Sequence, residues 1–315
     1  MPTVLITGGT GMLGTALTMA LLQKGYDVII LTRNGTKQPF KSPHLSYAEW
    51  DINHQSIDTT AIIKADYIIH LAGAGVFEKR WSKERKQEII DSRVKSSELL
   101  IKSLQKTRNK VKAVICASAI GWYGSSEVVN SSPRHGEKMF YEEDPSASDF
   151  LGTTCLQWEQ SIGRMKELEK RLVIFRQGIV LSREGGALKE FISPLRFGIA
   201  TVLGNGMQVL SWIHIDDLVR LYINAIEEES WNGVYNAVSP VPVTNKQLVI
   251  ALARARNGNR YLSIHVPSFL LRMILGEKSI EILKSARVSS DKLQRAGFKF
   301  HYPTIEMAMK QMFAK

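Results

Sequence analysis

The sequence predicts an α/β protein with a doubly wound parallel sheet and a smaller C-terminal lobe. Short apolar runs alternate with amphipathic stretches, and this alternation is typical of parallel strands joined by right-handed helical crossovers. A glycine-rich turn follows the first run, where such folds usually bind a ligand. The runs short and apolar enough for buried strands are Val4–Thr7, Val28–Thr32, Tyr67–Ala72, Val111–Ala117 and Leu172–Arg176. The helical stretches between them cover residues 12–25, 82–106 and 150–170.

The strongest local signal is the glycine turn after the first predicted strand. Its spacing is G-x-x-G-x-x-G, at the junction of a strand and a helix. Glycine permits a tight turn there and lets backbone N–H groups approach a pyrophosphate, which the helix dipole also attracts. We therefore expect a bound dinucleotide. Its contacts would come from Gly8, Thr10, Gly11, Met12, Leu13 and Gly14.

The ends of the next two strands predict which dinucleotide binds. NAD enzymes usually place an acid about 20 residues beyond the glycines to accept from the ribose hydroxyls. This chain has Leu31-Thr32-Arg33-Asn34 there. Arg33 can pair with a 2′-phosphate, so the sequence favours NADP (NADPH) over NAD. Asp51, after a predicted third strand, is a candidate acceptor for the adenine amino group.

The second half of the chain follows a looser pattern after about residue 181. Glycines punctuate its short segments, and a basic helical tail follows Pro242. We expect an NAD(P)-binding Rossmann domain over residues 1–180 and a substrate lobe over 181–315, with residues 208–240 returning to the sheet. No low-complexity linker separates the two, so the lobe is expected to be built onto the sheet.

Composition and charge narrow the possible partners. The 315 residues are 44% hydrophobic and 23% charged, which is typical of a globular protein. The net charge of +11 could attract nucleic acid or a small anion. We interpret the densest basic run as a solvated helix face, because no aromatic platform accompanies it, and we therefore expect no nucleic-acid partner. That run consists of Lys79, Arg80, Lys83, Arg85 and Lys86.

Other features of the chain predict its location and its remaining partners. It has two cysteines and no apolar stretch long enough to span a membrane, and its first residues do not have the basic start and longer apolar core typical of a signal peptide. We therefore expect a cytoplasmic monomer or homodimer with a small-molecule substrate, no membrane partner and no metal site.

Three segments resemble parts of the extended short-chain dehydrogenase/reductases, the NAD-dependent epimerase/dehydratase group. His70-Leu71-Ala72-Gly73 resembles the segment that lies along the cofactor, which implies cofactor contacts for Leu71, Ala72 and Gly73. Residues 117–124 resemble the strand that bears a serine near the nicotinamide, which implies that role for Ser118. Residues 211–217 match an Ile-His-Val-Asp-Asp segment that is mainly structural in the group, and His214 is expected to be structural too.

The central signature of that group, Tyr-x-x-x-Lys, is absent. Alignment on Glu159 puts Leu151 at the Tyr position and Cys155 at the Lys position. Neither can supply the proton relay of the family. Arg93 takes a family Asn position, and together with Ser118 and Cys155 it resembles an atypical subgroup called epimerase family proteins. Members of this subgroup are sometimes labelled cell-division inhibitors and carry a C-terminal segment of unknown function.

The position of Arg93 on the predicted helix after Ser82 independently supports a role in the site. Ile90, Ser97, Leu100 and Leu104 share one face of it, and Arg93 falls on the same stripe. A buried guanidinium is costly without a partner, so an anion or a set of carbonyls should meet it. Alternatively, its side chain snorkels past the edge of the sheet.

Two functions remain open from the sequence. The first is an NADP-binding oxidoreductase or epimerase acting on an unidentified small molecule, with Ser118, Arg93 and Cys155 as candidate catalytic residues. Arg93 would stabilise a developing alkoxide and Ser118 would donate a hydrogen bond, both beside the cofactor, while Cys155 would line the pocket. The proton would come from water, from Tyr123 or from the substrate. The alternative is a catalytically lapsed NADP(H)-binding sensor that acts through a protein partner.

Overall fold

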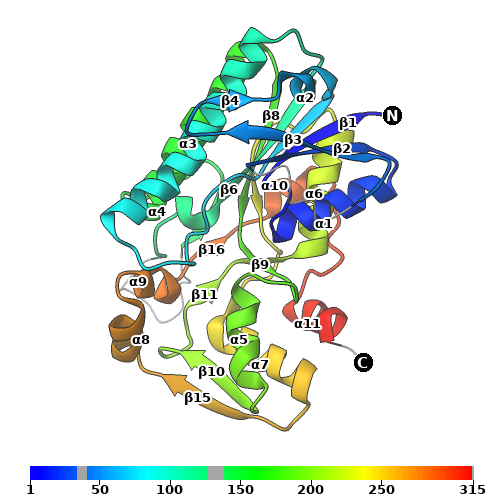
Figure 1. The fold of residues 1–315 in the computed structure, drawn as a ribbon. Helices are drawn as coiled ribbons and strands as arrows, with labels where there is room; N and C mark the ends of the chain where they lie inside the picture. The colour runs from blue at the N-terminus through cyan, green and yellow to red at the C-terminus, as the bar shows by residue number, and fades with distance from the viewer. Residues whose placement is uncertain (34–40, 127–137, 314–315) are drawn as a thin grey trace.

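The computed structural model describes residues 1–33, 41–126 and 138–313. Its centre is an eight-stranded sheet in the order β13-β8-β6-β5-β1-β2-β3-β4 (Figure 1). Every neighbouring pair is parallel except β3 with β4. This confirms the predicted α/β fold with a doubly wound sheet. The strands are β1 (Thr3–Thr7), β2 (Asp27–Thr32), β3 (Leu45–Asp51), β4 (Ser56–Ile57), β5 (Tyr67–His70), β6 (Ala113–Ala119), β8 (Arg171–Gln177) and β13 (Gly233–Ala237).

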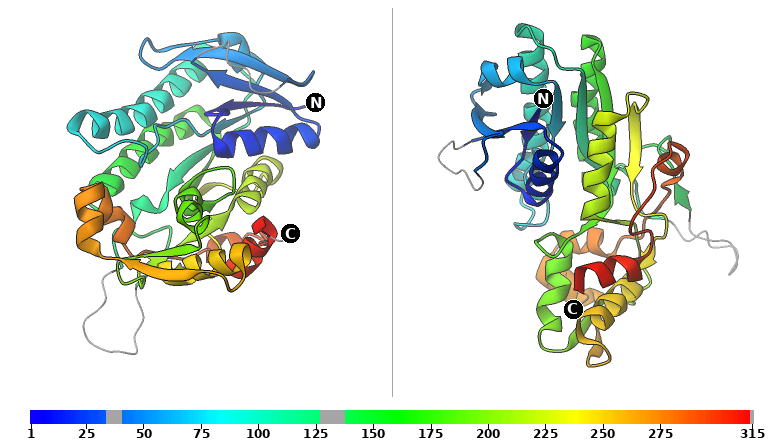
Figure 2. Two further views of the ribbon diagram at one scale, coloured as in Figure 1. Left: turned by 60° about the horizontal axis from the view of Figure 1, so that its bottom comes forward. Right: turned by 90° about the vertical axis from the view of Figure 1, so that its right-hand side faces the viewer.

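Helices cover both faces of this sheet and enclose two apolar cores (Figure 2). On one face lie α1 (Met12–Gln23), α6 (Ile215–Glu227) and α10 (Asp291–Arg295). On the other lie α2 (Thr59–Lys64), α3 (Lys83–Lys106) and α4 (Phe150–Gly163). Burial on both faces explains why the central strands are continuous apolar runs.

The predicted strands differ from the observed ones mainly at their ends. Strand β5 stops at His70, two residues earlier than predicted, and β6 starts and ends two residues later than predicted. The predicted helix over 150–170 is α4 followed by the short 3₁₀ helix η2 (Arg164–Leu168). Such end shifts are expected, because apolar runs define the centre of an element better than its limits.

The C-terminal lobe has a third core of its own. It is built on α5 (Ala187–Leu195), β10 (Ile199–Leu203), α7 (Asn245–Asn257), β15 (Leu262–Val266) and α11 (Ile305–Phe313). Three short strand pairs connect this lobe to the sheet. They join β9 (Ile179–Leu181) to β12 (Trp212–His214), β11 (Val209–Leu210) to β14 (Val243–Thr244), and β7 (Met139–Phe140) to β16 (Arg287–Val288).

The chain passes between sheet and lobe several times. After the lobe strand β10, it returns to the sheet through α6 and β13, and β13 pairs with β8 at the sheet edge. It then enters the lobe again and continues through α8 (Ser268–Leu275) and α9 (Lys278–Leu283). Among the described residues, no helix is long and apolar enough to cross a bilayer.

The segment around His214 fastens the lobe to the sheet. The His214 ring accepts from the N–H of Asp216 at the start of α6, and its Nε2 lies 3.1 Å from Gln311 Oε1 in α11. Asp217 accepts from the backbone N–H groups of His301 and Tyr302, at 2.9 Å each. The structure therefore gives His214 the structural position expected for it.

Candidate functional site

The glycine turn joins β1 to α1 in a geometry that only glycine fits. Gly8 has φ +69°, in the left-handed region. A Cβ on Gly14 would lie 2.3 Å from the carbonyl oxygen of Gly8, so the first turn of α1 packs directly on this loop. Gly11 precedes α1, and no side chain caps the N–H groups that follow. These uncapped N–H groups at a helix start fit a pyrophosphate.

The segment after β5 is held beside this turn by Thr7. Its Oγ1 accepts from the N–H groups of Leu71 and Ala72, at 3.1 Å each, and lies 2.8 Å from His70 Nδ1. Because two amides occupy the oxygen, the hydroxyl donates to Nδ1 and the His70 proton is on Nε2. A Cβ on Gly8 would lie 3.0 Å from the backbone of Leu71. Leu71 and Ala72 thus run alongside the turn, and contacts of Leu71, Ala72 and Gly73 with a cofactor stay a prediction.

His70 also connects this segment to α3. Its Nε2 lies 3.2 Å from Ser97 Oγ and 3.3 Å from Ser96 Oγ, and both serines donate to the carbonyl of Arg93. Complete burial lowers the pKa of His70 to about 3, so the ring is neutral at neutral pH. A neutral histidine therefore sets the position of the segment 71–73 relative to the helical turn that carries Arg93.

Arg93 lies between the backbone of Gly73 and the ring of Trp158. Its guanidinium carbon is 4.9 Å from the Trp158 ring centroid, and a Cβ on Gly73 would lie 3.0 Å from the same carbon. Nη1 donates to the carbonyls of Ala74 and Ile89, at 3.1 and 2.9 Å. The carbonyl partners expected for this guanidinium are therefore present. Burial lowers its pKa, yet an arginine stays charged at neutral pH.

The buried stripe of α3 differs by one residue from the prediction. Ile89 is fully buried and Ile90 only half-buried, so the stripe runs through Ile89 and not Ile90. The basic run before it was also interpreted wrongly in part, because Arg85 is 6% exposed and not a solvated residue. Arg85 donates to the carbonyl of Gly75 and pairs with Glu88.

The two residues predicted to contact the adenosine end of the cofactor lie at the ends of β2 and β3. Arg33 is exposed, and the residues 34–40 after it lie outside the described part of the chain. The Asp51 carboxylate is already bound within its own turn. Its Oδ1 accepts from the N–H groups of Asn53 and His54, and its Oδ2 lies 2.7 Å from His54 Nδ1. A contact of Asp51 with adenine stays a prediction.

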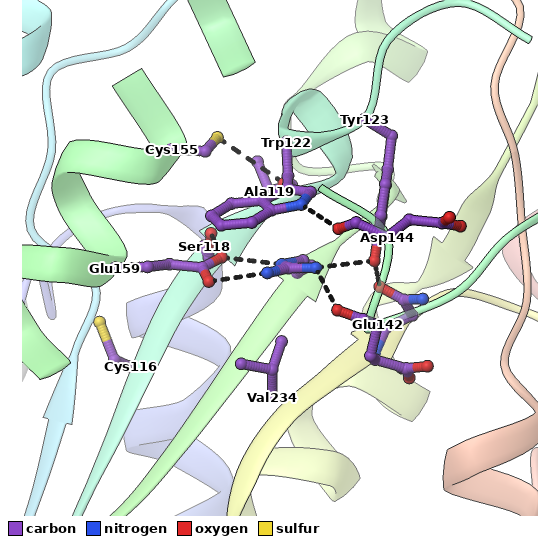
Figure 3. Close-up of polar contacts among 12 residues, drawn as sticks. Cys116, Ser118, Ala119, Trp122, Tyr123, Glu142, Asp144, Cys155, Glu159 and Val234 are labelled. Carbon is purple, nitrogen blue, oxygen red and sulfur yellow. Dashed lines mark hydrogen bonds and ion pairs between the residues drawn. The ribbon is translucent and has the colours of Figure 1, made fainter. Parts of the chain in front are cut away.

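Ser118 lies in a buried polar layer just below the ends of β6 and β8 (Figure 3). Its hydroxyl donates to Glu159 Oε1 on α4 at 2.6 Å. Glu159 in turn binds Arg176 through two bonds of 2.9 Å, from Nε to Oε1 and from Nη2 to Oε2. The expected donation from Ser118 to a ligand is therefore not the bond found here, since that proton goes to a carboxylate.

Tyr123 belongs to the same buried layer. Its hydroxyl donates to Asn236 Oδ1 at 2.7 Å and accepts from Arg176 Nη1 at 3.0 Å. Burial raises the pKa of Tyr123 to about 12, and its ring is fully covered. Tyr123 is thus no source of a proton for a bound ligand in this structure. The ring of Trp122 lies 3.6 Å from the guanidinium carbon of Arg176 and covers the layer.

Leu151, Cys155 and Glu159 lie on one face of α4, four residues apart. A Cβ on Gly121 would lie 3.2 Å from Leu151 Cβ and 3.7 Å from Cys155 Sγ, and Cys155 Sγ lies 3.7 Å from the carbonyl oxygen of Ala119. Burial, with a smaller effect of the Glu159 charge, raises the pKa of the Cys155 thiol to about 12. The thiol is therefore protonated at neutral pH, and Cys155 is buried as an apolar residue would be.

Arg176 and Glu159 are central to this layer, and neither was predicted from the sequence as a site residue. Two signals were available. Arg176 is a charged residue near the end of an otherwise apolar strand, and Glu159 follows Cys155 by one helical turn. A charged residue in a buried strand requires a partner of opposite charge.

The parallel sheet, the glycine turn and the uncapped start of α1 together define a dinucleotide-binding protein of the Rossmann type. Residues 4–237 match the NAD dependent epimerase/dehydratase family, and residues 266–312 match a domain of unknown function, DUF1731. The chain belongs to the NAD-dependent epimerase/dehydratase family.

Similar proteins cover nearly the whole chain. An epimerase family protein of Staphylococcus saprophyticus is 36% identical over 98% of both chains. Epimerase family protein YfhF of Bacillus subtilis is 34% identical over 99% of this chain and 98% of its own. Among solved structures, the human epimerase family protein SDR39U1 (isoform 2) with NADPH is 27% identical, with a TM-score of 0.84 over 98% of both chains. The predicted resemblance to the epimerase family proteins is therefore confirmed.

More distant structures share the fold. A UDP-glucose 4-epimerase of Thermotoga maritima, solved with UDP-glucose, is 19% identical, with a TM-score of 0.77 over 99% of this chain and 97% of its own. At that identity, the similarity concerns the fold alone.

Proposed function

We propose that this protein binds NADP(H) and acts as an oxidoreductase or epimerase on a small molecule without the Tyr-x-x-x-Lys pair. The proposal rests on the uncapped glycine turn after β1 together with the end of β2. There Arg33 is exposed, and no acidic residue is present. The NADPH in the structure of the human relative supports the same cofactor.

The described residues fit such a cofactor. The first N–H groups of α1, from Met12 to Gly14, would hold the pyrophosphate, and the segment Leu71–Gly73 would lie along the dinucleotide. Arg33 would pair with the 2′-phosphate. When bound, NADP(H) supplies hydride transfer.

Arg93 is the group that would act on the substrate. Two backbone carbonyls hold its Nη1, and its guanidinium plane is fixed between Gly73 and Trp158. A preorganised cation can stabilise a developing alkoxide without moving. A guanidinium is a poor proton donor, because it stays protonated in proteins. The proton would therefore come from water or from the substrate.

The test is the redox state of NADPH bound to the purified protein. Fractions of a metabolite extract are added, and the absorbance of the reduced nicotinamide is followed. A fraction that oxidises NADPH only when the protein is present, and not with the Arg93→Ala variant, supports the enzyme. An isomerisation of sugar or similar substrates with no net change in absorbance would be detected by mass spectrometry and NMR of the same fractions.

A second candidate function is a sensor that binds NADP(H) and reports its redox state to a protein partner. The site face of α4 favours it, because Leu151 has no ionisable proton and the Cys155 thiol has a pKa of about 12. Tight NADPH binding with no turnover on any fraction, together with a partner retained by one redox form only, would favour the sensor over the enzyme.

We also predict a cytoplasmic monomer or homodimer that does not bind nucleic acid or a membrane. Two residues of the basic run already bind other parts of the protein, which supports the prediction that nucleic acid does not bind. Arg85 is buried against Gly75 and Glu88, and Lys86 forms an ion pair with Glu277. Strongly salt-dependent binding of an oligonucleotide would contradict it.

A further inference from the structure

A charge cluster with a largely covered lysine at its centre lies where the C-terminal segment meets the start of α4. Lys284 Nζ lies 2.7 Å from Asp149 Oδ2 and 2.8 Å from Glu281 Oε2. The side chains of Lys284 and Glu281 are only 12% and 9% exposed, and that of Asp149 is 37% exposed. A covered ammonium between two carboxylates is strongly favoured over any arrangement that leaves one of these charges alone. The cluster therefore fixes the chain after α9 against α4.

Asp149 connects this cluster to the site. It is the N-cap residue of α4, and its Oδ1 accepts from the N–H of Gly152 at 2.8 Å. One carboxylate thus caps the helix with one oxygen and binds Lys284 with the other. The first two turns of that helix carry Leu151 and Cys155 to Gly121 and Ala119. A residue that holds Asp149 therefore also holds the part of α4 that faces the site.

The same C-terminal segment is fastened at three other points around the site. Lys86 at the start of α3 pairs with Glu277, and Lys278 Nζ donates to the carbonyl of Phe77 at 3.1 Å. The N–H of Ser126 donates to the carbonyl of Ser285 at 2.7 Å. Figure 1 shows α9 beside the first turns of α3 and α4, with α8 beyond it. The segment thus spans from the loop before α3 to the chain beyond β6.

We propose that residues 276–286 form a clasp that positions the first turns of α4 at the reacting end of the cofactor site, with Lys284 as its positioning residue. This assigns a role to part of the domain of unknown function. The assignment to the reacting end rests on the proposed function, because Leu151 occupies the position of the family's Tyr. The clasp itself rests only on the contacts above.

The variant that tests the clasp is Asp149→Asn. Asparagine caps a helix about as well as aspartate, so the cap at Gly152 remains while the charge that binds Lys284 is lost. In the cofactor-free protein we expect hydrogen exchange of the amides in the first turns of α4, and labelling of Cys155 by a thiol reagent, to accelerate about tenfold. Peptide mass spectrometry separates Cys155 from the second buried cysteine, Cys116.

The matched control is Asp58→Asn. Asp58 caps α2 by accepting from the N–H of Thr60, and it has no ion pair with the C-terminal segment. We expect exchange in α4 and labelling of Cys155 to stay within about twofold of wild type in this control. Equal rates at α4 for wild type, Asp58→Asn and Asp149→Asn would overturn the clasp.

A second pair of variants examines Lys284 itself. Lys284→Met removes the charge and Lys284→Arg retains it, so the arginine variant should restore slow labelling of Cys155 and the methionine variant should not. Labelling that stays slow in Lys284→Met, at an unchanged midpoint of unfolding, would also overturn the clasp. If Lys284→Met does not fold, Asp149→Asn decides alone.

The role at the reacting end has a readout of its own. With NADPH bound, Asp149→Asn should change the fluorescence of the nicotinamide while the dissociation constant changes less than about threefold, because the adenosine end is untouched. If hydrogen exchange in α4 accelerates while the nicotinamide fluorescence is unchanged, the role at the reacting end is overturned and the clasp itself is retained. Failure of wild type to bind NADPH would overturn the proposed function and not the clasp.

Discussion

The Glu159 carboxylate and the Arg176 guanidinium meet through two parallel hydrogen bonds of 2.9 Å, with both side chains at most 9% exposed. This pair connects α4 to β8, and Ser118 adds a third bond to the same carboxylate. The layer lies directly beneath Trp122, whose ring covers the guanidinium. Its geometry makes the pair a rigid support for the face of α4 that carries Leu151 and Cys155.

Removal of one partner of this pair should be costly. We expect Arg176→Met to lower the free energy of unfolding by about 3–5 kcal/mol, because Glu159 would remain buried without its counter-ion. Urea unfolding measures the change. The control, Lys24→Met, breaks the exposed pair with Glu227 and should cost less than about 1 kcal/mol. Similar small losses of stability in both variants would show that the buried Glu159 carboxylate does not need Arg176 as its counter-ion.

Two glycines in helices should respond in opposite directions to alanine. In Gly14→Ala the new Cβ would lie 2.3 Å from the Gly8 carbonyl oxygen, so the turn must shift, and we expect a loss of about 1–3 kcal/mol in stability. Gly163→Ala meets no atom within 4 Å and should stabilise α4 by up to about 1 kcal/mol. Thermal unfolding measures both. Weakened NADPH binding is expected for Gly14→Ala alone, and a Gly14→Ala protein as stable as wild type would contradict this packing.

His70 should make stability depend on pH. Its pKa is about 3 in the folded protein and about 6.5 in the unfolded chain, so between these values the unfolded chain binds one more proton. The free energy of unfolding should therefore fall by about 1.4 kcal/mol per pH unit as the pH drops below 6.5. Urea unfolding from pH 7 to 4.5 measures the slope.

His70→Gln is the control for this slope. Its free energy of unfolding should depend less steeply on pH than that of wild type, because one fewer proton is bound on unfolding. His214, another buried histidine with a lowered pKa, is present in both proteins and cancels in the comparison. Identical slopes for wild type and His70→Gln would contradict the buried neutral state of His70.

Arg93 and Cys155 should differ in their effect on turnover once a substrate fraction is known. Arg93→Ala should lose more activity than Cys155→Ala, and Arg93→Lys should restore it only in part. A lysine cannot lie flat between Gly73 and Trp158 while it binds two carbonyls. The steady-state rate of each variant measures this order. If Cys155→Ala is more damaging and thiol reagents abolish turnover, the thiol is the reacting group.

The sequence predicted the fold and the glycine turn because both depend on local patterns. Buried runs of branched residues define β1, β2 and β6, and glycine spacing defines the loop between β1 and α1. The periodicity of a helix predicts its buried face less exactly, which explains why Ile89 is buried where Ile90 was expected to be.

The orientation of single polar side chains could not be predicted in the same way. Ser118 binds Glu159, 41 residues away, and Tyr123 binds Asn236, 113 residues away. Such partners are set by the order of strands in the sheet and not by neighbours in the sequence. The charge of Arg176 in an otherwise apolar strand did indicate that a partner was required, and Glu159, one helical turn after Cys155, was the second signal.

The central claim, that Arg33 makes this an NADP(H)-binding protein, is tested most directly by the dissociation constants of NADPH and NADH. Isothermal titration of wild type, of Arg33→Asp and of the charge-matched control Arg108→Asp gives these constants. A contact between a guanidinium and the 2′-phosphate contributes about 1.5–3 kcal/mol, so wild type and the control should bind NADPH one to two orders of magnitude more tightly than NADH. Arg33→Asp should reverse the preference. Equal constants for the two cofactors on wild type would contradict the account.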